Sequence, residues 1–388
     1  MEQPIFLDNN STTPVDPQVL EAMLPYFHEN PGNAASQHKP GQYAEDAVED
    51  ARESVANIIN ASAHELIFTS GATESLNIAI QGILRNGKCG NHIITSSTEH
   101  PAVLDCCKAL ENGGAELSIL RVDNSGEIDL DELKQSIKEN TCMIAIMYAN
   151  NETGVINPVD AIAEIASANQ IPYICDATQA IGKIPVDVES GGIDIMAFSA
   201  HKIYGPKGTG ALFISSKYEK EISPSYYGGE QERGLSPGTQ NVPAIVGFGE
   251  ACRIARRNLR EDSDRIAELR HKLEFKLLTS CECEINGADS NRLPNTCNIL
   301  FKNIESQLLL ESVHGQLALS TGSACSSGNS TPSHVLQAMG KSSQQIMESV
   351  RFSLGKYTTS KDIDFAIKLI LERVEAFGLI TFEESRNL

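Results

Sequence analysis

Hydrophobic runs alternate with amphipathic segments from about residue 60 onward, and this alternation predicts the fold class. Short apolar runs predict seven strands, at 65–69, 92–96, 116–120, 142–148, 172–176, 194–198 and 209–213. Segments of helical periodicity lie between the earlier strands, at 73–84, 101–112, 130–138 and 158–168. Strands separated by a helix are usually parallel and joined by right-handed crossovers. We therefore predict an α/β domain with a mostly parallel seven-stranded sheet between helices, mixed where the last strands follow one another directly.

The pattern changes after residue 243 and predicts a second, smaller α+β domain. Its expected elements are a long amphipathic helix over 243–279, a strand at 295–301, a helix at 305–314, a short strand at 351–355 and a closing helix from Ser360. We place the domain boundary near residue 255. The large domain is then 12–255, and the small domain is 256–388 together with 1–11.

Charge and cysteine usage exclude several classes of partner. The net charge of −20 repels nucleic acid and anionic lipid surfaces. No apolar stretch reaches the roughly 18 residues of a membrane span, and the N-terminus lacks the pattern of a signal peptide. The ten cysteines form no CxxC pair. We therefore expect free thiols in a reducing compartment, with the cytoplasm as the location.

The segment SAHKIYGPKG (199–208) places a lysine directly after a predicted strand. Lys202 is positioned to form a Schiff base with a carbonyl cofactor, provided that its amine is partly desolvated. Ser199 and His201, with nearby backbone N–H groups, are suited to hold a phosphate. Taken alone, a surface lysine in a Gly/Pro turn is the commoner interpretation of this segment.

Two further strand ends carry complementary chemistry. In DATQ (176–179), Asp176 is placed to keep a pyridinium nitrogen protonated, and Gln179 to bond a ring hydroxyl, as a pyridoxal phosphate (PLP) site requires. In SGATES (70–75), a glycine precedes a predicted helix start, where the backbone at Ala72 and Thr73 faces any bound anion. Ordinary helix capping explains either motif when each is considered alone.

The order of these motifs argues against coincidence. His100, in STEHPAV (97–103), also follows a strand, where it can stack on a cofactor ring and move protons. Ligands of open α/β sheets bind at the carboxyl ends of the strands. The candidate residues that follow strands are Thr73, His100, Asn151, Asp176, Gln179, Ser199, His201 and Lys202. We therefore expect them to share one edge of one sheet.

The chain resembles the group I cysteine desulfurases, of the nitrogen-fixation and iron–sulfur-assembly type, among the fold-type I PLP enzymes. The resemblance runs nearly end to end. Its motifs are LDNNSTTPVD (7–16), GNAAS (32–36), FTSGATES (68–75), TEHPAV (98–103), NNETG (150–154), DATQAIGKIPVD (176–187), SAHKIYGPKG (199–208), GGEQERG (228–234), PGTQN (237–241), RLPNTCNI (292–299), TGSACSSG (321–328), PSHVL (332–336) and RFSLG (351–355). The set is specific, although no single member is.

This resemblance implies a role for each matching residue. Lys202 would hold PLP, Asp176 would contact the ring nitrogen, and Gln179 the ring oxygen. His100 would stack on the ring and act in catalysis. Other cofactor contacts would come from Ala72, Thr73, Asn151, Ser199 and His201, and from Thr239 of the second subunit of a homodimer. The substrate carboxylate would be held by Asn151 and Arg351, with help from Asn33.

The implied activity is conversion of L-cysteine to L-alanine, with the sulfur held as a persulfide on Cys325 for a protein acceptor such as an iron–sulfur scaffold or a thiolation protein. No resident metal is required, although Cys325 could ligate a transferred cluster. Ser236 and Ala34 stand where the family often has Arg and Pro. Three alternatives remain open: a selenocysteine lyase or related PLP lyase, an aminotransferase, and a non-catalytic sulfur carrier or scaffold protein on the same fold.

Overall fold

The computed structural model describes residues 4–87, 90–321 and 332–384, with side chains described as far as residue 378. Its centre is a seven-stranded sheet in the order β2-β8-β7-β6-β5-β3-β4. The strands are β2 (Leu66–Thr69), β3 (His92–Ser96), β4 (Glu116–Leu120), β5 (Thr141–Ala145), β6 (Tyr173–Asp176), β7 (Ile195–Ser199) and β8 (Gly210–Ile214). Strand β8 runs antiparallel to both neighbours, and the other pairs are parallel. The predicted α/β class and the mixed, mostly parallel sheet are confirmed.

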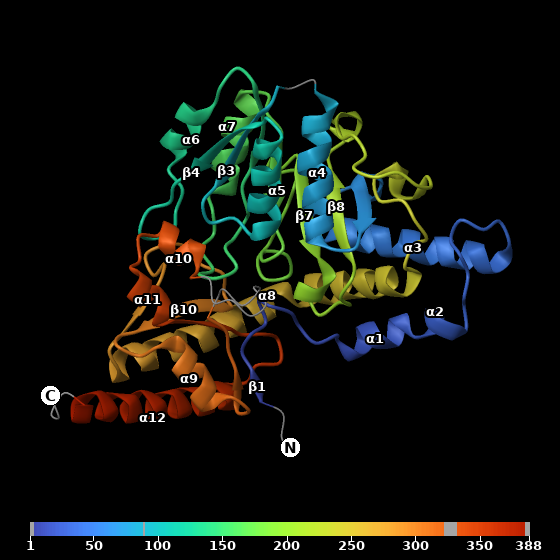
Figure 1. Ribbon diagram of the computed structural model, residues 1–388. Helices are drawn as coiled ribbons and strands as arrows, with labels where there is room; N and C mark the ends of the chain where they lie inside the picture. The colour runs from blue at the N-terminus through green and yellow to red at the C-terminus, as the bar shows by residue number, and fades with distance from the viewer. Residues whose placement is uncertain (1–3, 88–89, 322–331, 385–388) are drawn as a thin grey trace.

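Both faces of this sheet are buried by helices. Neighbouring residues of one strand, such as Ile93 and Ile94, belong to two different apolar clusters because successive side chains point to opposite faces. Helices α4 (Ala72–Asn86) and α5 (Pro101–Asn112) cover one face, the near side in Figure 1. The opposite face packs against other helices, namely α3 (Lys39–Asn57), α6 (Leu130–Ser136), α7 (Val159–Ala168) and the first part of α8 (Val242–Ser280).

The helices before residue 60 were not among the sequence predictions. They are α1 (Pro17–Met23), α2 (Pro25–His28) and α3. Two signals in the sequence point to them: Asp16 caps α1 ahead of Pro17, and α3 repeats buried small residues such as Ala44, Val48 and Ala51 on one side. Alanine-rich faces of this kind carry a weaker hydrophobic signal than the strands do, which explains the omission.

The helix α8 joins the large sheet to the second part of the chain, as Figure 1 shows. Residues up to Ile254 pack into the core under the large sheet, and residues from Ile266 onward pack into a separate core. That second core lies on an antiparallel sheet of β9 (Cys283–Ile285), β10 (Thr296–Phe301) and β12 (Ser349–Ser353). The predicted domain boundary near residue 255 lies inside this continuous helix, and the division into two domains stays a prediction.

The remaining elements complete the second part. They are β1 (Ile5–Phe6), which pairs with β11 (Leu317–Ala318), and helices α9 (Ser306–Val313), α10 (His334–Ala338), α11 (Ser343–Met347) and α12 (Ser360–Glu384). The strand predicted at 351–355 begins two residues earlier, at Ser349, and the strand predicted at 142–148 ends at Ala145. Among the described residues, no helix combines the length and the apolar character that crossing a membrane requires.

Candidate active site

A cavity of about 260 Å³ lies where the carboxyl ends of β6 and β7 face the N-terminus of α4. Most of the predicted site residues line it: Ala72, Thr73, His100, Asn151, Asp176, Gln179, Ser199, His201, Lys202 and Arg351. Asn10 and Ser11, which precede α1, line it as well, and sequence reasoning assigned them no part in the site. The structure brings these residues together, and their individual roles stay predictions.

Lys202 ends a short 3-10 turn, Ala200–Lys202, that directly follows β7. Its Nζ donates to the carbonyl oxygens of Asn10 and Ser11, at 2.6 Å each. These carbonyls belong to the N-terminal segment, more than 190 residues away in sequence. These two carbonyl oxygens hold the amine at the wall of the cavity that Lys202 lines.

The N-terminus of α4 provides an anion-binding end to the cavity. Its N-cap is Gly71, which has φ 155° and contributes no side-chain cap, so the next N–H of the first turn, that of Thr73, is left for a ligand. A Cβ at Gly210 would lie 2.7 Å from the Cα of Gly71, so glycine is required where β8 passes this turn. Ser199 Oγ accepts the Ala72 N–H at 2.7 Å. An adjoining hollow adds Thr12 and Lys207 to this end.

The two histidines of the cavity are held in their neutral forms. Burial lowers the pKa of His100, and the charge of Lys202 adds to that effect, although Asp176 opposes it. The Nδ1 of His100 accepts the Ala102 N–H at 3.1 Å, so the proton of the neutral ring lies on Nε2. Burial, with the charges of neighbouring lysines, lowers the pKa of His201 to about 4. His201 is therefore a neutral hydrogen-bonding group near pH 7.

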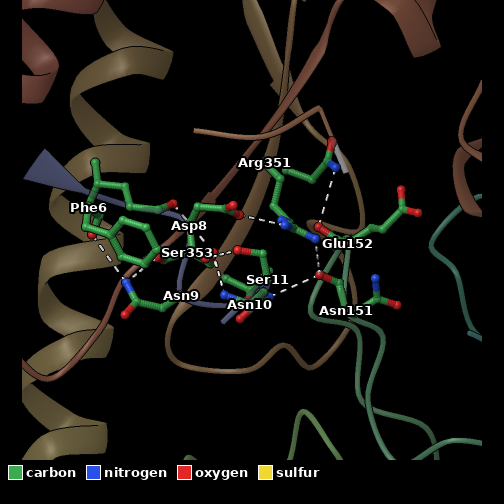
Figure 2. Close-up of polar contacts among 12 residues, drawn as sticks. Phe6, Asp8, Asn9, Asn10, Ser11, Asn151, Glu152, Arg351 and Ser353 are labelled. Carbon is green, nitrogen blue, oxygen red and sulfur yellow. Dashed lines mark hydrogen bonds and ion pairs between the residues drawn. The ribbon is translucent and has the colours of Figure 1, made fainter. Parts of the chain in front are cut away.

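Arg351 enters the cavity from β12 of the second part. Figure 2 shows its guanidinium between the Asp8 carboxylate, at 2.7 Å, and the Asn151 carbonyl, at 3.1 Å. Its Nε is buried and has no acceptor among the described residues. A buried donor of a charged group that lacks a partner is costly, so this position favours an anionic ligand.

Two of the predicted site residues that the structure describes lie outside this cavity. Asn33 is exposed and does not line the cavity, and its Oδ1 accepts the N–H of Ala35. Thr239 is exposed and lines a different hollow. In that hollow Ser236 donates to Glu74 at 3.0 Å. Cys325 lies outside the described residues.

Glu99 is a buried acid that sequence reasoning missed, although it directly precedes His100. One carboxyl oxygen, Oε1, accepts from the Ser96 hydroxyl and the Met147 N–H, whereas Oε2 has no partner among the described residues. Burial raises the pKa of Glu99 to about 8, and the nearby Asp176 contributes to the rise. Glu99 is therefore mostly protonated and uncharged near pH 7.

The chemistry of these donor sets fits pyridoxal phosphate. The helix N-terminus at Thr73 and the hydroxyl of Ser199 suit a phosphate. The Lys202 amine suits an aldehyde, and the buried carboxylate of Asp176, at the end of β6, suits a pyridinium nitrogen. Arg351 already pairs with the Asp8 carboxylate, and its Nε can bind a second carboxylate, that of a ligand. The cavity thus has a place for each polar part of this cofactor.

The protonation of Glu99 predicts a pH-dependent difference in stability. The pKa of Glu99 in the folded protein lies above the unfolded value of about 4.3. The contribution of Glu99 to the free energy of unfolding is therefore complete below pH 4.3 and is lost as the pH rises to 8. Glu99→Gln mimics the protonated acid. The stability of the cofactor-free wild type should therefore fall relative to this variant between pH 5 and pH 8, as measured by urea unfolding. Glu53→Gln, at an exposed position, is the control. Parallel curves for wild type and Glu99→Gln would contradict the assignment.

Comparison with known proteins agrees with this geometry. Residues 5–365 match the aminotransferase class-V family. Cysteine desulfurase IscS of Anaeromyxobacter sp. (strain Fw109-5) is 44% identical over 377 residues, which cover 96% of this chain and 93% of the relative. Cysteine desulfurase IscS of Methylococcus capsulatus is 45% identical over 376 residues, with the same coverage of 96% and 93%.

Solved structures agree as well. A NifS-like protein superposes with a TM-score of 0.90 at 38% identity, covering 96% of this chain and 99% of that one. SspA in complex with cysteine gives a TM-score of 0.81 at 34% identity, covering 92% and 100%. The predicted fold-type I architecture and PLP chemistry are those of this family. The chain therefore belongs to the aminotransferase class-V family, and within it to the cysteine desulfurases.

Proposed function

We propose that this protein converts L-cysteine to L-alanine with PLP bound to Lys202, and that it holds the released sulfur as a persulfide on Cys325. The observation that carries the proposal is the single cavity lined by Lys202, Asp176, His100 and Arg351, in a chain that is 44% identical to cysteine desulfurases. These residues come from four separated segments, and no simpler structural need explains their convergence.

PLP, when bound, supplies an electron-accepting ring. The chain's own groups would hold that ring: the helix N-terminus at Ala72 and Thr73 binds the phosphate, and the Asp176 carboxylate contacts the ring nitrogen. The walls near His100 are partly apolar, with Ala102 and Met147 lining the same cavity. Such surroundings exclude water from the reacting atoms and strengthen the electrostatic interactions of the polar groups.

His100 would move the protons of the reaction. Its Nε2 carries the proton of the neutral ring, because Nδ1 is occupied by the N–H of Ala102. A lowered pKa lets the ring release a proton readily after it has accepted one. The Lys202 amine, once freed by substrate, can return to the carbonyls of Asn10 and Ser11 or act as a second proton carrier.

The substrate carboxylate would bind Arg351, whose Nε lacks an acceptor among the described residues. Asp8 and the Asn151 carbonyl keep the guanidinium in place while it receives this ligand. A planar guanidinium can bond both oxygens of a carboxylate, which would fix the direction in which the rest of the amino acid points. The substrate's sulfur can then be presented to one side of the cavity.

The sulfur transfer would follow as a balanced exchange. The Cys325 thiolate forms an S–S bond to the substrate sulfur, and the bond between that sulfur and the substrate carbon breaks. The electron pair of the broken bond stays with the carbon skeleton, which takes up protons and leaves as alanine. The sum is L-cysteine plus enzyme thiol giving L-alanine plus enzyme persulfide, with no external oxidant or reductant. A protein acceptor, an iron–sulfur scaffold or a thiolation protein, would then take the sulfur.

A homodimer belongs to this proposal. Thr239 is exposed and lies in a hollow separate from the cavity of its own chain, as expected of a residue that contacts the cofactor of a partner subunit. Its loop is anchored by Glu232, which accepts from Arg52 at 2.8 Å and from the Phe68 N–H at 2.8 Å. We also propose a cytoplasmic location, which the eight free cysteines among the described residues support.

Replacing Cys325 tests the proposed persulfide. Cys325→Ala should retain PLP binding and lose alanine production from L-cysteine, because none of the eight described cysteines lines the cavity and could replace it. Alanine release and the visible absorption of the PLP-loaded protein are measured together. Cys281→Ala, which removes a half-buried cysteine of the second part, is the control and should keep its activity. Full activity of Cys325→Ala would instead favour a lyase that needs no cysteine nucleophile.

Replacing Arg351 tests the proposed carboxylate site. Lys keeps a positive charge but cannot bond two oxygens in one plane. One lost hydrogen bond to a charged group is worth about 1.5–3 kcal/mol, so Arg351→Lys should raise the KM for L-cysteine by at least roughly tenfold. Its PLP absorption should stay that of the wild type. An unchanged KM would exclude Arg351 from substrate binding.

A further inference from the structure

Lys183 lies beside the cavity and belongs to no predicted set of site residues. Its Nζ donates to Gln179 Oε1 at 2.5 Å and to Asn10 Oδ1 at 3.3 Å. Within the described residues, no carboxylate lies at ion-pair distance from it; both of its acceptors are amide oxygens. Lys183 follows Gln179 by four residues in a helical turn after β6. Residues four apart in such a turn lie on the same side, so the two side chains meet.

The contacts of Gln179 leave only one orientation for its amide. Oε1 receives the Lys183 amine, and Nε2 donates to the carbonyl oxygen of Asn10 at 3.1 Å. Rotating the amide by half a turn would place its NH2 group against the lysine N–H groups and its oxygen against a carbonyl oxygen. Both contacts would be repulsive, so Lys183 and the Asn10 carbonyl together hold the amide in this orientation.

The selected orientation matters because Gln179 lines the cavity. Nε2 carries two protons, and Asn10 takes one of them. The second is available to a ligand in the cavity. Gln179 therefore offers this ligand a hydrogen-bond donor as long as its oxygen faces Lys183.

A lysine at this place carries an electrostatic cost. Burial, the Lys202 ammonium and the Arg351 guanidinium lower the pKa of Lys183 well below its ordinary value. No carboxylate at ion-pair distance offsets this charge among the described residues. An apolar side chain would pack here at a lower energetic cost. We therefore expect that the N–H groups of Lys183 are needed for their hydrogen bonds to Gln179 Oε1 and Asn10 Oδ1.

We propose that Lys183 is a positioning residue: it locks the Gln179 amide so that Nε2 donates a hydrogen bond to the ring oxygen of bound PLP. This inference rests on the proposed function. A donor on the ring oxygen withdraws electron density and lowers the proton affinity of the neighbouring nitrogen that joins the ring to Lys202. The orientation of Gln179 that Lys183 fixes thereby sets the midpoint pH at which the visible absorption of the PLP-loaded protein changes.

The test is a pH titration of the visible absorption of the PLP-loaded protein. Lys183→Met removes the lock, and the titration midpoint should rise by about one pH unit, the effect of one hydrogen bond to a charged group. Lys183→Gln keeps N–H groups for both oxygens and removes the charge, so its midpoint should stay close to that of the wild type. Lys368→Met, at an exposed position of α12, is the control.

Several outcomes would overturn the inference. If Lys183→Met has the same titration midpoint as the wild type, Lys183 does not fix the orientation of the Gln179 amide. An equal rise in Lys183→Met and Lys183→Gln assigns the effect to charge and contradicts positioning. A full rise for Lys183→Met in a Gln179→Ala background also contradicts it, because Lys183 would then act without Gln179.

A second variant keeps the inference testable if Lys183→Met does not fold. Gln179→Glu retains the contact with Lys183 but replaces the N–H donor with an acceptor, so its midpoint should rise; an unchanged midpoint contradicts the inference. The result is separable from the proposed function. If wild-type protein develops no visible band with PLP, the proposed function fails, whereas a normal wild-type band with unshifted variants overturns only the role of Lys183.

Discussion

The site depends on the placement of one buried asparagine, Asn10, in the segment before α1. Its backbone carbonyl accepts from Lys202 and Gln179, and its side-chain oxygen accepts from Lys183 and Asn295. Its Nδ2 donates to the Asn151 carbonyl and to Thr296, and its backbone N–H donates to Ser353. These partners belong to the strand ends of the large sheet and to the strands of the second part. Asn10 and Ser11 line the cavity, so its wall is complete only when this segment lies between the two.

The charges around this segment are arranged for anionic ligands. Lys202 and Lys183 donate to neutral oxygens, and Arg351 pairs with the Asp8 carboxylate. Burial and the neighbouring lysines keep His201 neutral, and burial keeps Glu99 protonated. Among the described residues that line the cavity, the cations Lys202 and Arg351 therefore exceed the one carboxylate, that of Asp176, although the whole chain carries a net charge of −20. A phosphate and a substrate carboxylate would supply the charge that the cavity lacks.

Local patterns predicted much of this structure. The strands of the large sheet and the residues that follow them were readable because both faces of a parallel sheet are apolar and ligands gather at its carboxyl edge. Asn10, Lys183 and Glu99 were missed for a physical reason. Asn10 acts through partners 169 and 192 residues away, and a buried lysine or glutamate looks like a surface residue in sequence. The helix α3 was missed because its buried face consists largely of alanine and valine.

The central claim is that PLP forms its covalent bond with the amine of Lys202 and not with that of the nearby Lys183. The most direct measurement is mass spectrometry of protein that has been incubated with PLP, reduced with borohydride and digested. The account predicts that the cofactor is attached to the peptide that contains Lys202 and that Lys183 is unmodified. Attachment at Lys183 or another lysine while Lys202 is unmodified, or no attachment at all, would contradict it.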